Sequence, residues 1–239
     1  MNKRIYLIII WTITFGVAAF TCYKSINGGL KFVKFDNGIT IGNEDESKHI
    51  TGHEGALSLE VEPFTKLEVD AGVMGVSVKK GTSYSVYCSY SSQKLEPVIE
   101  NKGDTLVITQ HSQNFNGDSS KCEMTITVPK NITLDDIYAD IKVGAFEIDG
   151  ISLDKGKINT DVGAIEIRDC EFNKLNMNSN VGAIQINLTG KTQDYDWDLT
   201  TSLGAIEVRH RNYHRSYFQN NNSGKKITAK SNIGAIEVK

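Results

Sequence analysis

A short apolar unit with Gly-Ala at its centre occurs five times in the second half of the chain and constrains the fold more than any other feature. The copies are Val143-Gly-Ala-Phe-Glu-Ile148, Val162-Gly-Ala-Ile-Glu-Ile167, Val181-Gly-Ala-Ile-Gln-Ile186, Leu203-Gly-Ala-Ile-Glu-Val208 and Ile233-Gly-Ala-Ile-Glu-Val238. Their glycines lie 19, 19, 22 and 30 residues apart. Such a period is too short for a propeller blade or a helical repeat, and it fits one turn of a β-solenoid.

The phase of the apolar residues changes at each glycine. Before Gly163 the sequence alternates through Ile158, Thr160 and Val162, whereas Ile165 and Ile167 lie one step out of phase with them. Alternation predicts a strand with one buried face, and the phase change predicts a bend, which glycine tolerates. Each unit should therefore form strand, glycine corner and strand around one core, with Val143, Val162, Val181, Leu203 and Ile233 stacked inward. An inward hydroxyl ladder is expected from Thr160, Ser179, Thr201 and Ser231, each pairing with the next.

An earlier segment fits the same template, because residues 67–73 alternate and Met74-Gly75 is expected at a corner. The sequence thus predicts an all-β, single-domain β-solenoid over residues 61–239, with about six rungs of two strands each. Residues 79–130 are expected to be an inserted β-meander with strands near 83–90, 105–110 and 123–128. The predicted corner residues are Gly75, Gly144, Gly163, Gly182, Gly204 and Gly234.

The N-terminus predicts export. Residues 1–4 form a short basic flank, and residues 5–23 contain no charge and would span roughly 28 Å as a helix. Basic residues before such a segment favour a cytoplasmic N-terminus. We expect one transmembrane helix in the cell membrane with an extracytoplasmic C-terminal domain, or a cleaved signal peptide and a secreted domain. Cys22 is a poor lipidation site because Phe20 and Thr21 precede it, and residues 24–60 are expected to be a polar tether.

Composition and motifs argue against several function classes. The net charge of −3 leaves no basic stripe for nucleic acid. Two His-x3-His pairs, His49/His53 and His210/His214, fall outside any predicted helix and so do not predict zinc. No cofactor, metal or catalytic residue is predicted, because no pair of carboxylates stands apart from the periodic ones and no nucleophile motif occurs.

One carboxylate position recurs in the repeats, at Glu147, Glu166, Glu207 and Glu237, with Gln185 interrupting. Stacked at about 5 Å, these side chains would either bind divalent cations or form a solvated face. The second interpretation is favoured, because Arg168, Arg209 and Lys239 follow two residues later and can neutralise them.

Two cysteines and one loop are further candidates. Cys88 and Cys122 lie in strand-like runs of one subregion, and they could form a disulfide outside the cytoplasm or remain free thiols, whereas Cys170 is expected to fill space in the core. Residues 209–222 read as either a binding loop or a decorated surface loop. The candidate binding residues are Arg209, His210, Arg211, Tyr213, His214, Arg215 and Tyr217.

The last repeat unit ends at Lys239 without a capping segment. A bare strand edge templates further pairing, so the C-terminal rung is expected to meet a second copy or another envelope protein. Alternatively, the inserted strands or the tether cover it.

Several segments resemble the bacterial putative-adhesin family of β-strand-repeat domains. They are Phe64-Thr-Lys-Leu-Glu-Val69, Thr105-Leu-Val-Ile-Thr109, the hinge Val128-Pro-Lys-Asn-Ile-Thr-Leu134 and every Gly-Ala-Ile unit, which together cover about residues 60–239. The resemblance implies a β-solenoid and an envelope location, with no established activity and with some relatives linked to envelope-stress signalling. We therefore expect a non-catalytic extracytoplasmic surface module for adhesion, scaffolding or envelope-stress sensing. The alternative is a carbohydrate-binding or carbohydrate-active β-helix protein acting on wall polysaccharide.

Overall fold

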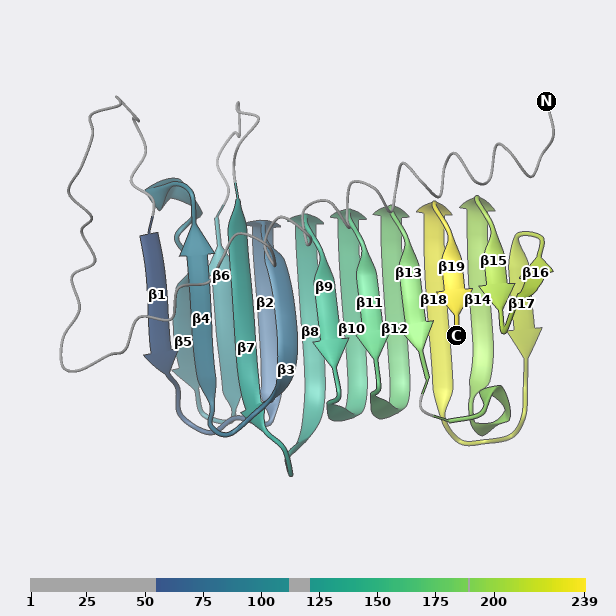
Figure 1. Cartoon of the computed structure of the whole chain (residues 1–239), viewed down its shortest axis with the longest axis horizontal. Helices are drawn as coiled ribbons and strands as arrows, with labels where there is room; N and C mark the ends of the chain where they lie inside the picture. Colours follow the sequence, from purple (N-terminus) through teal and green to yellow (C-terminus); the bar gives the residue numbers. More distant parts are fainter. Residues whose placement is uncertain (1–54, 112–120, 189) are drawn as a thin grey trace. The chain divides into compact units, whose positions relative to one another are not determined.

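The computed structural model describes residues 55–111, 121–188 and 190–239 (Figure 1). Within these ranges the regular elements are β-strands and two single 3-10 turns, η1 (Gln93–Leu95) and η2 (Thr192–Asp194). The all-β prediction is therefore confirmed. The predicted anchor or signal peptide, residues 5–23, lies outside the described residues, as do His49 and His53. In the part that is described, no helix has the length and apolar character needed to cross a membrane.

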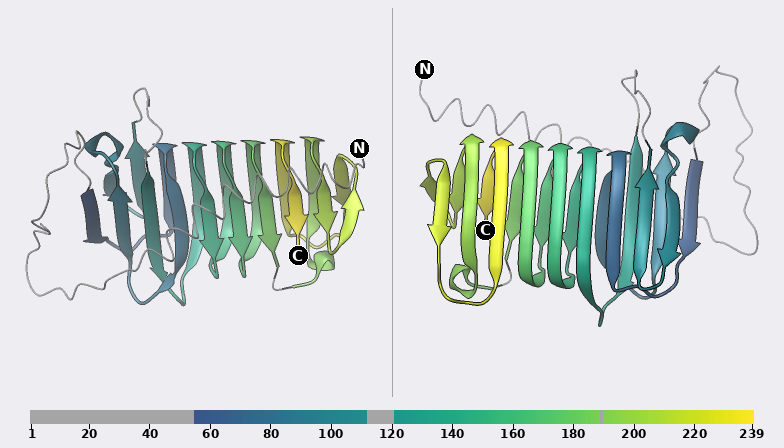
Figure 2. Two further views of the ribbon diagram at one scale, coloured as in Figure 1. Left: turned by 45° about the horizontal axis from the view of Figure 1, so that its top comes forward. Right: turned by 180° about the vertical axis from the view of Figure 1, so that it is seen from behind.

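The strands form two sheets that face each other (Figure 2). In spatial order, sheet A contains β1 (Gly55–Glu60), β4 (Ser85–Tyr90), β7 (Cys122–Pro129), β3 (Gly75–Gly81), β9 (Phe146–Asp149), β11 (Ile165–Arg168), β13 (Ile184–Asn187), β19 (Ile236–Val238), β15 (Ile206–Val208) and β16 (Arg211–Tyr213). Sheet B contains β17 (Ser216–Gln219), β14 (Asp196–Leu203), β18 (Lys226–Ile233), β12 (Glu171–Val181), β10 (Ser152–Val162), β8 (Thr133–Val143), β2 (Lys66–Val73), β6 (Thr105–Gln110) and β5 (Val98–Lys102).

A rung is one sheet B strand that passes across a corner into one sheet A strand, as β10 passes into β11. Successive rungs pair in parallel and in register, so that Thr160 lies between Ile141 and Ser179, and Ile165 lies between Phe146 and Ile184. Ile158, Ile165 and Ile167 all face the core, which confirms the predicted change of phase at the glycine. The repeat therefore predicts this β-solenoid-like stack correctly.

The order of the rungs in space differs from their order in the chain. The rung β18–β19 lies between β12–β13 and β14–β15, and Ile233 pairs with both Val181 and Leu203 (Figure 1). After β13 the chain skips one level, and the longer intervals of 22 and 30 residues between glycines provide the connections that let it return. The prediction of a bare edge at the C-terminal rung is therefore wrong. Binding of a partner stays a prediction, without this strand as its site.

Antiparallel strands cover both ends of the stack. At one end β16 pairs with β15 and β17 pairs with β14; at the other, β4 pairs with β7 and β5 pairs with β6. The predicted inserted meander is wrong in its pairing, because β6 and β7 lie parallel to β2 and β3 and add a further rung. Residues 55–60 of the predicted tether form β1, which pairs with β4. These outer strands cover rung edges that would otherwise be open to pairing.

The residue before each corner glycine does not face the core. Val143, Val162, Val181, Leu203 and Ile233 lie directly above one another, as predicted, but their side chains are 43–63% exposed. The expectation that they stack inward is therefore wrong. The physical reason is that the bend begins before the glycine, so that two consecutive residues, such as Asp161 and Val162, both face solvent.

The corner glycines permit a close approach between rungs. Gly163 has a φ of +155°, and a Cβ at this position would overlap the carbonyl oxygen of Gly144. The same overlap with the neighbouring corner would occur at Gly144, Gly182, Gly204 and Gly234. Gly75 is the exception, because Met74 occupies the corner of that rung and Gly75 begins β3. Its prediction as a corner residue is wrong.

The buried hydroxyls donate to the corners instead of to one another. Ser179 Oγ donates to the Gly163 carbonyl oxygen at 3.1 Å, Ser231 Oγ to that of Gly182 at 3.0 Å, and Thr201 Oγ1 to that of Gly234 at 3.1 Å. Each of these bonds joins a hydroxyl to the corner of the adjacent rung. The predicted hydroxyl ladder is thus wrong: these three hydroxyls bond to the corners of neighbouring rungs, and Thr160 Oγ1 donates to the Gly163 carbonyl oxygen of its own rung at 3.4 Å.

We expect Gly163→Ala to lower the free energy of unfolding by more than about 3 kcal/mol, because the new Cβ overlaps backbone that cannot move without shifting a rung. Gly224→Ala is the matched control: Gly224 also has a positive φ, of +75°, but nothing lies within 4 Å of the added Cβ. The control should cost only about 1 kcal/mol. Urea unfolding followed by circular dichroism measures both, and equal losses would contradict the role of close stacking.

Candidate functional site

The most distinctive outward feature of the described residues is an aliphatic line along the corner edge. We call it the apolar ridge and define it, in spatial order, as Val143, Val162, Val181, Ile233 and Leu203. It follows the edge where the sheet B strands pass into sheet A (Figure 1). At roughly 4.8 Å per rung, its five side chains extend over about 19 Å.

A second, smaller apolar line runs beside the ridge. Beyond each corner glycine stands an alanine, and these alanines are partly exposed: Ala145, Ala164, Ala183, Ala235 and Ala205. Single exposed aliphatic side chains are ordinary, but a contiguous line of them is typical of an interaction surface. The fold needs the glycine at this corner, whereas it does not bury the residue before it. The ridge is therefore a candidate binding surface.

Sequence reasoning missed this surface. Strict alternation assigns Val162 and its counterparts to the buried face, and the stack shows that the bend precedes the glycine. The alternation alone does not show whether the residue before the glycine faces the core or the solvent.

Satisfied polar side chains flank the ridge on sheet B. Asn180 Nδ2 donates to Asp161 Oδ1, and Asn232 Nδ2 donates to Asn180 Oδ1, both at 2.9 Å. Lys142 Nζ lies 2.9 Å from Asp140 Oδ1 and 3.9 Å from Asp161 Oδ2. These five polar side chains are thus engaged within the chain.

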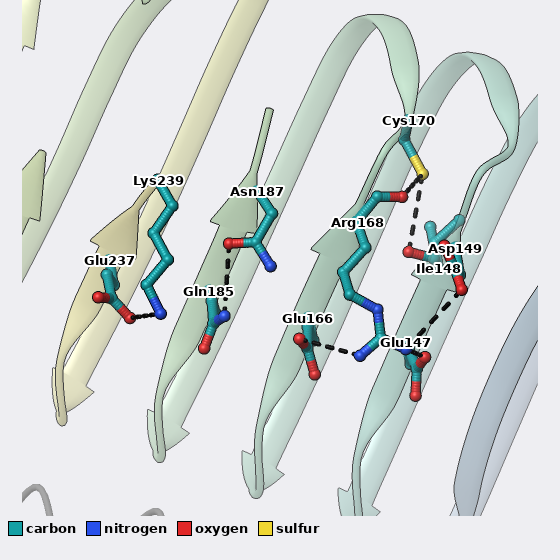
Figure 3. A network of polar contacts seen from close by, with 10 residues as sticks. All are labelled: Glu147, Ile148, Asp149, Glu166, Arg168, Cys170, Gln185, Asn187, Glu237 and Lys239. Atoms are coloured by element: carbon teal, nitrogen blue, oxygen red, sulfur yellow. Dashed lines mark hydrogen bonds and ion pairs between the residues drawn. The ribbon is translucent and has the colours of Figure 1, made fainter. Parts of the chain in front are cut away.

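The recurring carboxylate position lies on the sheet A strands, beyond the ridge and its alanines. We call it the carboxylate column and define it as Glu147, Glu166, Gln185, Glu237 and Glu207. Figure 3 shows four of these side chains and their contacts. Arg168 pairs with Glu147, and its guanidinium lies 3.2 Å from Glu166 and 3.9 Å from Asp149. Burial raises the pKa of Glu166, and nearby Lys239 opposes this shift. Together with the ion pair between Lys239 and Glu237 at 3.1 Å, these contacts confirm the predicted neutralising role for Arg168 and Lys239. The prediction is wrong for Arg209, because Glu207 lies 3.5 Å from His210 Nδ1 instead. Among the residues placed by the structure, no group of three or more His, Cys, Asp or Glu side chains could hold a metal ion.

The predicted binding loop forms the two strands that cap one end of the stack, β16 on sheet A and β17 on sheet B. Tyr213 and Tyr217 pack against the core at the end of the stack, with ring centroids 4.6 Å apart. The arginines and histidines remain exposed, and Arg209, His210 and Arg215 adopt positive φ at the turns. Arg209 Nη2 donates to the Gly190 carbonyl oxygen at 2.8 Å. The structure therefore divides the candidate residues into two inward tyrosines and an outward basic set.

Phe218, on the capping strand β17, is 73% exposed. Sequence reasoning did not single it out, although its place between Tyr217 and Gln219 in an alternating run assigns it to the face opposite Tyr217.

Cys88 and Cys122 lie together as free, buried thiols with their sulfur atoms 3.6 Å apart. They stand on the antiparallel neighbours β4 and β7, where Cys122 pairs with Tyr90 and Cys88 with Met124. Their shared hydrogen bond lowers the pKa of Cys88 and raises the pKa of Cys122, which burial raises further.

Cys170 is buried and separate from the pair. Its thiol donates to the carbonyl oxygen of Arg168 at 3.0 Å, and burial raises its pKa to about 11. These contacts fit the predicted role of a space-filling core residue.

Comparison with known proteins gives one family match and several similar structures. The family model described as Toastrack DUF4097 matches residues 64–239. The chain is similar to a solved structure of a putative cell adhesion protein from Clostridium sporogenes, with 20% identity, a TM-score of 0.63, and coverage of 78% of this chain and 99% of that chain. At this identity the likeness shows the fold alone.

Two further structures are more distant. A putative adhesin from Bacteroides fragilis has 17% identity and a TM-score of 0.36, and covers 78% of this chain and 97% of its own. A putative lipid binding protein from Parabacteroides distasonis has 12% identity and a TM-score of 0.29, and covers 79% of this chain and 98% of its own. No curated protein matches the sequence.

We expect oxidation to convert Cys88 and Cys122 into a disulfide, because the sulfurs need to close only from 3.6 Å to about 2.05 Å. A bridge spanning 34 positions should add about 4 kcal/mol to the free energy of unfolding in the chain-entropy model. Mass spectrometry after diamide treatment and urea unfolding with and without reductant provide the measurement.

Cys122→Ser is the control for this bridge and should show no dependence of its stability on reductant. Recovery of two free thiols at positions 88 and 122 after oxidation would show that the strands hold the sulfurs apart.

Proposed function

The chain belongs to the Toastrack DUF4097 family, and from this membership we propose that it is a non-catalytic surface module that binds a macromolecule outside the cytoplasm. Adhesion, scaffolding and envelope-stress sensing all require a rigid body with a binding surface. The two-sheet stack supplies the rigid body, because each inner rung pairs on both sides and both ends are covered. We propose that the N-terminal segment, residues 5–23, holds this module at the membrane.

The observation that carries the proposal is the apolar ridge. Its five aliphatic residues face solvent at the same place in successive rungs. The fold gains little core from them, so their recurrence in every repeat fits a role in contact with another molecule. Removing such a strip from water would supply a hydrophobic driving force for binding.

The ridge favours a protein partner over a glycan. Polysaccharide presents hydroxyl groups, and covering these with aliphatic side chains leaves them without hydrogen bonds. Carbohydrate binding or turnover is therefore the second candidate function, and a glycan found on the ridge would move it ahead of the first.

A photo-crosslinkable amino acid at Val162 tests this proposal in intact cells. Irradiation should join the chain covalently to a second macromolecule, which electrophoresis and mass spectrometry would reveal. The same amino acid at Lys157 is the control, because Lys157 is exposed on the same strand, β10, but lies away from the corner. Equal yields of adduct from both positions, or no adduct from Val162, would refute the ridge as a binding surface.

The location is tested separately with Asn212→Cys, an exposed position on the capping strand β16. We expect a membrane-impermeant maleimide to label it in intact cells, and the labelled chain to stay with the membranes after carbonate extraction. Labelling that occurs only after lysis would refute the extracytoplasmic placement.

A further inference from the structure

We propose that the partner of the apolar ridge is a second copy of this chain, with the two ridges packed face to face. This inference rests on the proposed function, because it names the partner of the same surface. Three properties of the ridge support it: its pitch, the difference in size between its two apolar lines, and the state of its flanking charges.

The pitch of the ridge matches another stack of the same kind. Its side chains repeat at the spacing of paired strands, about 4.8 Å, over five rungs. A helix repeats at about 5.4 Å per turn, and an extended strand presents alternate residues at about 6.8 Å. A second copy keeps its side chains in step with the ridge along its full length, whereas the other two drift out of step.

The two apolar lines are complementary in size. The larger side chains, such as Val181, stand on the sheet B side of the corner, and the smaller ones, such as Ala183, stand on the sheet A side. A two-fold axis along the stack exchanges these sides. It places the apolar ridge of one copy over the line of alanines of the other. The same contact occurs twice, as in an isologous interface.

Such an axis also leaves both stacks pointing in the same direction. Two copies attached to one membrane through equivalent N-terminal segments would meet this condition.

The flanking charges do not oppose the approach of a second copy. Arg168 is paired with Glu147 and Glu166, Lys239 with Glu237, and Lys142 with Asp140. Basic side chains therefore stand among the carboxylates on both flanks, which reduces the repulsion between two identical surfaces.

The area of the ridge predicts a weak dimer. Five aliphatic residues that are 43–63% exposed offer a few hundred Å² per copy, whereas a stable interface buries about 800 Å² per partner. Association should therefore depend on the higher effective concentration of chains that share a membrane.

Cysteine crosslinking of the full chain in its native membrane tests the pairing. One tagged copy carries Val181→Cys, a second copy with a different tag carries Ala183→Cys, and both carry Cys22→Ser. Mild oxidation should give a heterodimer. The Val181→Cys copy paired with Asn176→Cys, on the same strand but away from the corner, should give none.

Two lysine substitutions on β18 test whether the ridge forms the dimer contact, one within the ridge and one, as the control, away from it. Ile233→Lys places a charge within the ridge and should reduce the heterodimer about tenfold or more, whereas Thr228→Lys, on the same strand away from the ridge, should change it less than about twofold. Val162→Lys repeats the first substitution at another rung, and thermal unfolding confirms that each variant is folded.

The outcomes separate the two proposals. No heterodimer between the Val181→Cys and Ala183→Cys copies, or an equal effect of Ile233→Lys and Thr228→Lys, overturns the second copy as partner. If the photo-crosslinking at Val162 then yields a different protein, a lipid or a glycan, this inference fails while the proposed binding surface stands. If the Val162 position yields no adduct of any kind, both fail.

Discussion

The structure depends on the close contact between backbones at successive corners. The carbonyl oxygen of Gly163 lies beneath Gly182 and also accepts a hydrogen bond from Ser179. Only a residue without a Cβ fits there, and only a small hydroxyl side chain in the core reaches the carbonyl. The corner thereby sets the height of each rung and the register of both sheets. The carboxylate column and the apolar ridge follow from this spacing, because each repeats once per rung.

Much of the fold could be predicted from the repeat. Alternation around residues such as Ile158 and Ile167 gives the strands and their buried face, and the phase change at Gly163 gives the corner. The neutralised carboxylate column also follows from the spacing of Glu166 and Arg168. These features are local, because each depends on residues within one unit or on the same position in the next unit.

The rest depends on contacts that the sequence pattern does not encode. The spatial order of rungs is a choice among equivalent neighbours, since any apolar rung can pair with any other. Val162 alternates with buried residues and yet faces solvent, because the bend begins one residue earlier than the pattern suggests. The capping role of Tyr213 and Tyr217 likewise requires knowledge of which rung ends the stack. The candidate surface therefore emerges only from the assembled corners.

The position of β18–β19 has a consequence for how the domain assembles. The rungs from β6–β7 through β12–β13 are contiguous in space and can form one block as the chain supplies them. The rung β14–β15 and its capping strands, β16 and β17, have no rung beside them on the inner side until β18–β19 fills the empty level. The strands β18 and β19 thus join the two parts of the stack on either side of them. Their insertion converts two separate blocks into one cooperative unit, and completion of the domain becomes a single late event.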